Sequence, residues 1–166
     1  MHDAQCIAGI AFSSGLLGIV HSMAHKTGAA FTGDHIIHGC ANAMYLGKVI
    51  QFNARDERAK SRYAFIAKDV LHLAGETEDE LVEALVQKIR DLNDALDIPQ
   101  GIKNYGKSGV KADESIIDYE EFEAKKADVA ANAILDACTG SNPRIPTQEE
   151  MEQLLECVYT DTPVKF

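Results

Sequence analysis

The chain has 166 residues, 46% of them hydrophobic, which is enough to bury the core of one domain over residues 1–166. Its 26 acidic residues outnumber the 16 lysines and arginines, and the formal net charge of -10 argues against nucleic acid or an anionic membrane as a partner, since both require a basic surface. The four cysteines form no Cys-x-x-Cys pair, and we find neither a secretory signal nor an apolar run of membrane length, so we expect a cytoplasmic protein with reduced thiols.

The first region, residues 3–26, is rich in alanine and glycine and is apolar on nearly every side. A helix of this kind belongs at the centre of a bundle, so we expect one long core helix that ends near Gly28. An apolar stretch that starts at Cys6 is unusual for a native N-terminus and predicts that the chain begins inside a larger fold. A loop through residues 31–34 then leads to a second predicted helix, from about His38 to Phe52.

The middle of the chain predicts two further helices, over residues 54–73 and 78–97. The first of them carries arginine and lysine on one face. The second has the clearest amphipathic pattern; it starts with a capping box formed by Thr77 and Glu80, and Pro99 follows its end. Its predicted core stripe consists of Leu81, Leu85, Ile89, Leu92 and Leu96.

The last third predicts a glycine-containing loop over residues 100–115, a helix over 119–138, a turn over 138–144 and an extended tail over 160–166. A second capping box, Thr147 with Glu150, opens a short final helix through Cys157. No segment has the period-two alternation of a half-buried strand, so the predicted fold class is all-α, a helical bundle. The residues expected to face inward from the helix over 119–138 are Phe122, Val129, Ala133 and Ile134.

Four of the six histidines lie between positions 21 and 38, flanked by small or apolar residues. His21 and His25 are one helical turn apart and share a face, and His38 stands beside Gly39 at the start of the next predicted helix. A single histidine in such a setting is usually a hydrogen-bonded core residue, but clustered imidazoles indicate a metal site. Besides His21 with His38, we keep open an improvised site of Asp34, His21, His35 and His38.

The chain resembles the iron-containing (group III) alcohol dehydrogenases over nearly its whole length. Each motif is weak by itself, but together they are specific. The matching segments are Ala11-Phe-Ser13, Leu17-Gly18, His21-Ser-Met-Ala-His25-Lys-Thr-Gly28, His38-Gly-Cys-Ala-Asn-Ala43, Phe52-Asn-Ala54 and Asp136-Ala-Cys-Thr-Gly-Ser-Asn-Pro-Arg144.

The resemblance implies an oxidoreductase that interconverts small alcohols and aldehydes with NAD or NADP. In that family an N-terminal α/β domain binds the nucleotide, and a C-terminal helical domain holds Fe(II), sometimes zinc, through an Asp and three His residues. Carried over by motif, His21 and His38 are metal ligands, and His25 is the histidine near the nicotinamide, a proton relay. The same resemblance implies that Phe12 and Cys138 line the substrate pocket, with Phe12 also on the cofactor side.

The departures from the family pattern concern what precedes the histidines. The family's first two ligands and its whole nucleotide-binding domain lie upstream of anything in this sequence, so we expect a helical domain truncated at its N-terminal side. The segment from His25 to His38 is longer than is usual, which leaves His35 as an alternative ligand; Gly39 and the following Ala-Asn-Ala favour His38. Gly47 stands where the family often has proline.

Two readings of function follow from this pattern. The first is the C-terminal part of an alcohol dehydrogenase, inactive on its own because nothing in the sequence cradles a dinucleotide. The second is a non-catalytic helical assembly or metal-binding module. Apolar surface around Ile7, Ile10 and Leu16 predicts a homo-oligomer, or a partner chain that supplies the missing domain.

Overall fold

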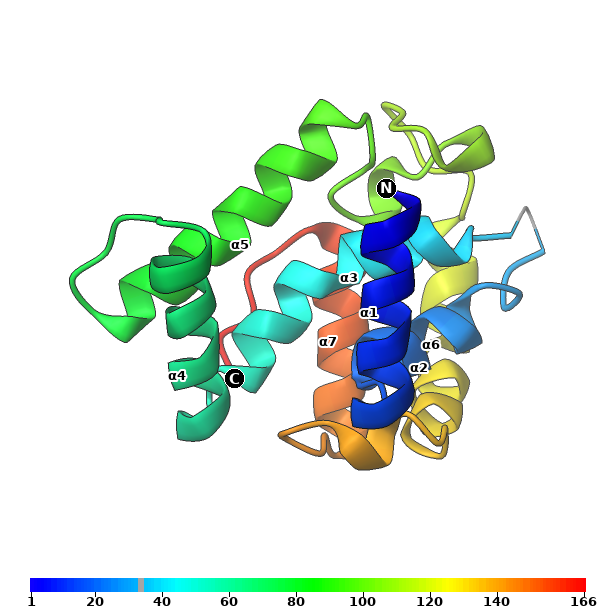
Figure 1. Ribbon diagram of the computed structural model, residues 1–166. Coiled ribbons are helices and arrows are strands. Elements are labelled where there is room, and N and C mark those ends of the chain that lie inside the picture. Colours follow the sequence, from blue (N-terminus) through cyan, green and yellow to red (C-terminus); the bar gives the residue numbers. More distant parts are fainter. Residues whose placement is uncertain (33–34) are drawn as a thin grey trace.

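The computed structural model describes residues 1–32 and 35–166, and its regular structure in these ranges is helical (Figure 1). An isolated antiparallel bridge between Tyr105 and Lys111 is the only strand-type pairing there. The all-α prediction is therefore confirmed. The α-helices are α1 (His2–Gly15), α2 (Ile19–Thr27), α3 (His38–Asn53), α4 (Glu57–Phe65), α5 (Glu78–Ala95), α6 (Tyr119–Ile134) and α7 (Gln148–Thr160). A π-helical segment, η1 (Ile66–Val70), extends α4, and short 3₁₀ turns are η2 (Ile102–Asn104), η3 (Lys107–Gly109) and η4 (Thr139–Ser141).

The prediction of one long helix over residues 3–26 is wrong. The chain breaks after Gly15, where Leu16 adopts a left-handed backbone with φ 63°, and α1 and α2 meet at a bend of 104°. No residue of α1 is buried, and Ile7, Ile10 and Leu16 are exposed as expected. Among the described helices none could cross a membrane singly, although the bent pair α1 and α2 together has the necessary length and composition.

Contacts from the far end of the sequence fix the break between α1 and α2. Ser141 donates a hydrogen bond to the Leu17 carbonyl, and the Asn142 side-chain oxygen accepts one from the first amide of α2, at Ile19. A side chain at Gly18 would meet that oxygen at 2.6 Å, so this close approach requires glycine. A helix continuing through residues 16–18 would lose all of these contacts.

The centre of the bundle is α3, not the N-terminal segment. It packs against α2 and α7 on one side and against α4 and α5 on the other (Figure 1). The larger core cluster joins α2, α3, α6 and α7, and the smaller one joins α3, α4 and α5. The largest fully buried side chains are Tyr45, Tyr105, Phe52 and Phe122.

The amphipathic stripe of α5 is only partly confirmed. Leu81 and Leu85 are buried and Ile89 packs against the smaller core, but Leu92 and Leu96 are exposed. Polar Asn93 takes the inward position at this turn and donates a hydrogen bond of 3.1 Å to the Ala43 carbonyl. The spacing of apolar residues by three and four therefore predicted a longer buried face than α5 has.

Other boundaries follow the sequence more closely. Both predicted capping boxes form, at the starts of α5 and α7. The helix expected over 54–73 begins later, because Asp56 accepts a hydrogen bond from the Ala59 amide and caps α4. The helix expected over 119–138 ends earlier, at Ile134, and α7 continues to Thr160. The residues expected to face inward from α6 do so: Phe122, Val129 and Ala133 are buried, and Ile134 packs against the core.

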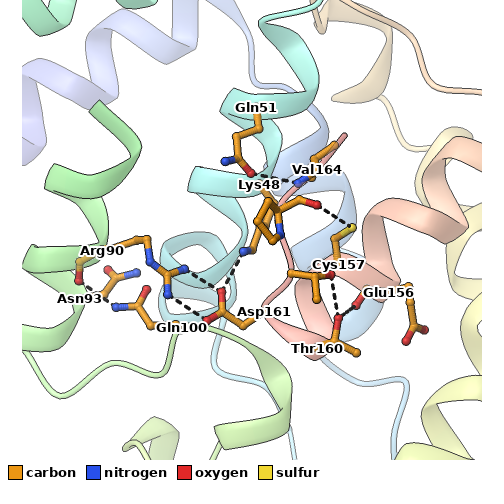
Figure 2. Close-up of polar contacts among 12 residues, drawn as sticks. Lys48, Gln51, Arg90, Asn93, Gln100, Glu156, Cys157, Thr160, Asp161 and Val164 are labelled. Atoms are coloured by element: carbon orange, nitrogen blue, oxygen red, sulfur yellow. Dashed lines mark hydrogen bonds and ion pairs between the residues drawn. The ribbon is translucent and has the colours of Figure 1, made fainter. Parts of the chain in front are cut away.

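The chain's last residues are tied to the bundle around Asp161, which ends α7 in a left-handed conformation with φ 55°. Figure 2 shows its carboxylate between Arg90 of α5 and Lys48 of α3. Farther along, the Val164 amide donates to the Gln51 side-chain oxygen at 3.1 Å. The tail thus joins three helices although it has no regular structure.

Candidate active site

Three of the predicted histidines converge where α2 packs on α3. His21 and His25 project from successive turns of α2, and His38 is the first residue of α3. The ring centroid of His38 lies 5.3 Å from that of His21 and 5.3 Å from that of His25, and the His25 and His38 rings are stacked. The His21 and His25 centroids are 6.1 Å apart.

Asn42, one turn into α3, connects two of these rings. Its side-chain nitrogen lies 3.3 Å from Nε2 of His21 and 3.0 Å from Nε2 of His38. An amide nitrogen only donates, so both Nε2 atoms act as acceptors and carry lone pairs. Burial, with smaller contributions from His38 and His25, lowers the pKa of His21, which favours the neutral ring that binds metals.

The residues present here suit a metal ion. Two imidazole lone pairs aimed at one electropositive group supply part of the ligand shell of a divalent cation, and nitrogen donors suit Fe(II) and zinc. The Asn42 side-chain oxygen is buried and has no hydrogen-bond partner. A buried polar atom left in this state points to a ligand or water at the site.

His35 contacts the end of α2, where its Nδ1 is 3.2 Å from the Gly28 carbonyl. The ring that the structure brings beside His21 is that of His38. The improvised site also needed Asp34, which lies outside the described residues.

His25 pairs with a carboxylate from the other end of the sequence. Its Nδ1 donates to Oδ2 of Asp136 at 3.2 Å, and the Lys26 ammonium lies 3.0 Å from the same oxygen. The other oxygen, Oδ1, accepts the Cys138 amide at 3.0 Å. Burial would raise the pKa of Asp136, but the Cys138 amide, Lys26 and His25 outweigh it and hold that pKa well below its usual range.

The two predicted pocket residues lie in different surroundings. Cys138 adjoins Asp136, and burial, reinforced by that carboxylate, raises the pKa of its thiol. Phe12 lies on α1 and is 48% exposed; among the ring contacts of the described residues, none joins it to the three histidines. The structure thus places Cys138 next to the histidine cluster and leaves Phe12 on the surface.

Sequence reasoning gave no role to three residues of this site: Lys26, Asn42 and Asp136. All three stand inside motifs that carry the family resemblance, and those motifs were the signal available in the sequence. The contact of Asp136 with His25 spans 111 positions, and no local pattern indicates it. In the described ranges, His25, Asp136 and Cys138 are the one group of three ligand-type side chains whose donor atoms all lie within 4.8 Å of one another.

Comparison with known proteins gives consistent results. A family model described as "Fe-containing alcohol dehydrogenase family, C-terminal" matches residues 1–159. The chain is 50% identical over 166 residues to the NADPH-dependent butanol dehydrogenase of Clostridium saccharobutylicum, and 35% identical over 173 residues to the bifunctional aldehyde-alcohol dehydrogenase AdhE of Escherichia coli. These matches cover 100% and 96% of this chain, but only 39% and 18% of the relatives.

Solved structures agree with the sequence matches. An iron-containing alcohol dehydrogenase from Thermococcus thioreducens superposes with a TM-score of 0.75 at 31% identity, covering 97% of this chain and 36% of that one. A 1,3-propanediol oxidoreductase superposes with a TM-score of 0.66 at 27% identity, covering 86% and 33%. The chain therefore spans about two fifths or less of the length of these relatives.

Proposed function

The chain belongs to the Fe-containing alcohol dehydrogenase family, and from this membership we propose that it supplies the metal-holding and proton-transferring part of an NAD(P)-linked enzyme that interconverts alcohols and aldehydes. The observation that carries the proposal is the convergence of the His21 and His38 lone pairs on a single donor, the Asn42 amide. Fe(II), or zinc in its place, is the ion we assign to these two ligands. When bound, such an ion polarises the alcohol or aldehyde oxygen as a Lewis acid.

We assign the remaining roles at the site to three side chains of this chain. His25 takes up or gives back the proton that leaves or joins the substrate oxygen, and it would stand on the cofactor side of the site when the dinucleotide is bound. Cys138 lines the pocket from its position beside Asp136, and Phe12 joins the pocket and the cofactor side when the rest of the enzyme covers α1. The further ligands and the dinucleotide site come from the remainder of the enzyme, so residues 1–166 by themselves are expected to transfer no hydride.

Assembly is part of the proposal. α1 buries none of its residues, and an apolar groove runs beside its end, lined among others by Leu16, Leu46 and Ile66. Exposed apolar surface of this kind favours association. We infer a homo-oligomer, or a pairing with a chain that carries the nucleotide-binding domain, in the cytoplasm.

The test is a chimera in which this chain replaces the aligned segment of the Clostridium saccharobutylicum butanol dehydrogenase. We expect the chimera to hold Fe(II) or zinc and to oxidise NADPH with butanal; NAD(H) is assayed in parallel. His21→Ala and His38→Ala should each abolish metal content and turnover. His35→Ala is the matched control and should retain both.

Two results would change the conclusion. A folded chimera that neither binds metal nor oxidises NADPH would refute the proposed function. Stoichiometric metal without turnover would leave the chain as a metal-binding module.

A further inference from the structure

Asp136 is a partly buried carboxylate to which the proposed function gives no task. We propose that Asp136 is a positioning residue that holds His25 in the Nδ1–H tautomer and fixes its ring plane, so that Nε2 is the nitrogen that exchanges the substrate's proton. This inference rests on the proposed role of His25 as proton carrier. It concerns which nitrogen does the work and what keeps it in place.

The carboxylate is itself firmly positioned. Asp136 follows α6, its side chain is only 11% exposed, and its two oxygens have separate partners. Oδ1 accepts the Cys138 backbone amide, which fixes the plane of the group. Oδ2 is then directed at α2, where it meets both His25 and Lys26. A carboxylate held by backbone on one side can orient a side chain on the other.

The tautomer follows from the hydrogen bond. An ionised carboxylate only accepts, so the Nδ1 of His25 must carry the proton, and in the neutral ring Nε2 is left with its lone pair. His21 and His38 have the same free atom, because Asn42 donates to Nε2 of each. All three rings of the cluster therefore present Nε2 as the acceptor atom.

A cation held by His25, Asp136 and Cys138 is the competing interpretation of the same cluster, since their donor atoms lie within 4.8 Å of one another. Two observations oppose it. The Lys26 ammonium already lies 3.0 Å from Oδ2 and would have to leave. The Cys138 thiol has a raised pKa, whereas a soft metal binds the thiolate. With Lys26 already paired to Oδ2, Asp136 is not available as a metal ligand. The remaining contact of that oxygen is the hydrogen bond that orients His25.

The first test measures the tautomer directly in residues 1–166. Two-bond ¹⁵N–¹H correlation spectra, recorded well above the imidazole titration range and assigned with His25→Gln, report which ring nitrogen carries hydrogen. We expect Nδ1–H in the wild-type chain and a shift toward Nε2–H in Asp136→Ala. Asp128→Ala, which removes an exposed carboxylate from α6, should change nothing. An Nε2–H ring in the wild type, or no response to Asp136→Ala, would overturn the proposal.

The second test uses the butanol dehydrogenase chimera. Losing a residue that orients a catalytic side chain typically costs about 10- to 100-fold, so we expect kcat for Asp136→Ala to fall by that factor with little change in the KM for butanal. Asp136→Asn, which keeps an acceptor oxygen, should recover part of the loss. In a His25→Ala background, Asp136→Ala should have no further effect, because its action passes through His25.

The two tests distinguish failure of the proposed function from failure of the positioning role. An inactive wild-type chimera would count against the proposed function, while the spectra would still decide the tautomer. A further loss of kcat when Asp136→Ala is added to His25→Ala would show that Asp136 acts independently of His25, and would refute its positioning role.

Discussion

Arg90 and Asp161 form a bidentate ion pair, with Nη1 2.7 Å and Nη2 2.9 Å from the two carboxylate oxygens (Figure 2). The same carboxylate lies 2.8 Å from the Lys48 ammonium, whose side chain is only 7% exposed. One aspartate therefore pairs with cations from two helices at the point where α7 ends. The stability of the bundle should depend on it.

We predict that Asp161→Ala lowers the free energy of unfolding by about 3 kcal/mol, because it leaves the buried Lys48 charge without a partner. Urea unfolding followed by circular dichroism measures this. Asp97→Ala is the control: Asp97 also has a left-handed backbone, with φ 56°, but is exposed, so it isolates the backbone cost. Equal losses in the two variants would mean that the ion pairs contribute nothing.

The pairs of Asp161 also predict a dependence on pH. Burial raises the pKa of this carboxyl, but Arg90 and Lys48 outweigh it, and the folded-state pKa lies below its usual value. The unfolded chain then binds the proton more tightly, so the stabilisation is complete above the unfolded pKa and is lost as pH falls below about 4 toward the folded value. Urea midpoints between pH 7 and acid should fall less steeply in Asp161→Asn. Parallel curves for both proteins would contradict this.

Gly109 lies where the loop over residues 100–115 packs against Cys40 of α3, and a substitution there tests this close packing. It has φ 80°, and a Cβ there would lie 2.6 Å from the Cys40 sulfur. Gly109→Ala should cost about 2 kcal/mol from backbone strain and overpacking together. Gly140→Ala, where a Cβ meets nothing within 4 Å, should be nearly neutral in the same urea experiment. Adding Cys40→Ala removes the sulfur that the new Cβ meets, so it should restore the part of the unfolding free energy lost to overpacking. If nothing is restored, the whole loss comes from backbone strain.

We predict that residues 1–166 form a dimer or a larger oligomer in solution, because Ile10 and Leu16 expose apolar side chains on and beside α1. Multi-angle light scattering measures the mass. Ile10→Lys with Leu16→Lys should shift the protein toward monomer, whereas Leu135→Lys, at an exposed leucine outside the groove beside α1, should not. A wild-type monomer at all concentrations would disprove the prediction.

Sequence patterns predicted best where the determinants are local. The capping boxes of α5 and α7 each need only four consecutive residues, and both formed. The break between α1 and α2 depends instead on Ser141 and Asn142, so the uniform apolarity of residues 3–26 was misleading. On α5, the leucine spacing predicted a helix correctly but could not show that Asn93 would take the inward position.

The site too has features that local sequence predicts and features that depend on the tertiary structure. The one-turn spacing of His21 and His25 follows from helix geometry, and the family motif favoured His38, which the structure places beside His21. The partner of His25 could not be deduced from spacing, because Asp136 lies 111 positions away and reaches it only through the packing of α2 on α6. Asn42 was visible as part of a motif, but its position between two rings requires the tertiary structure.

The hydrogen bond from the Ile19 amide to Asn142 also bears on the order of events during synthesis. It joins residues 123 positions apart, and the start of the histidine-bearing helix has no side-chain cap of its own. Until the segment with Asp136 and Asn142 has left the ribosome, α2 lacks both this anchor and the carboxylate that meets His25. The pairing of His25 therefore forms only after that later segment has packed against α2.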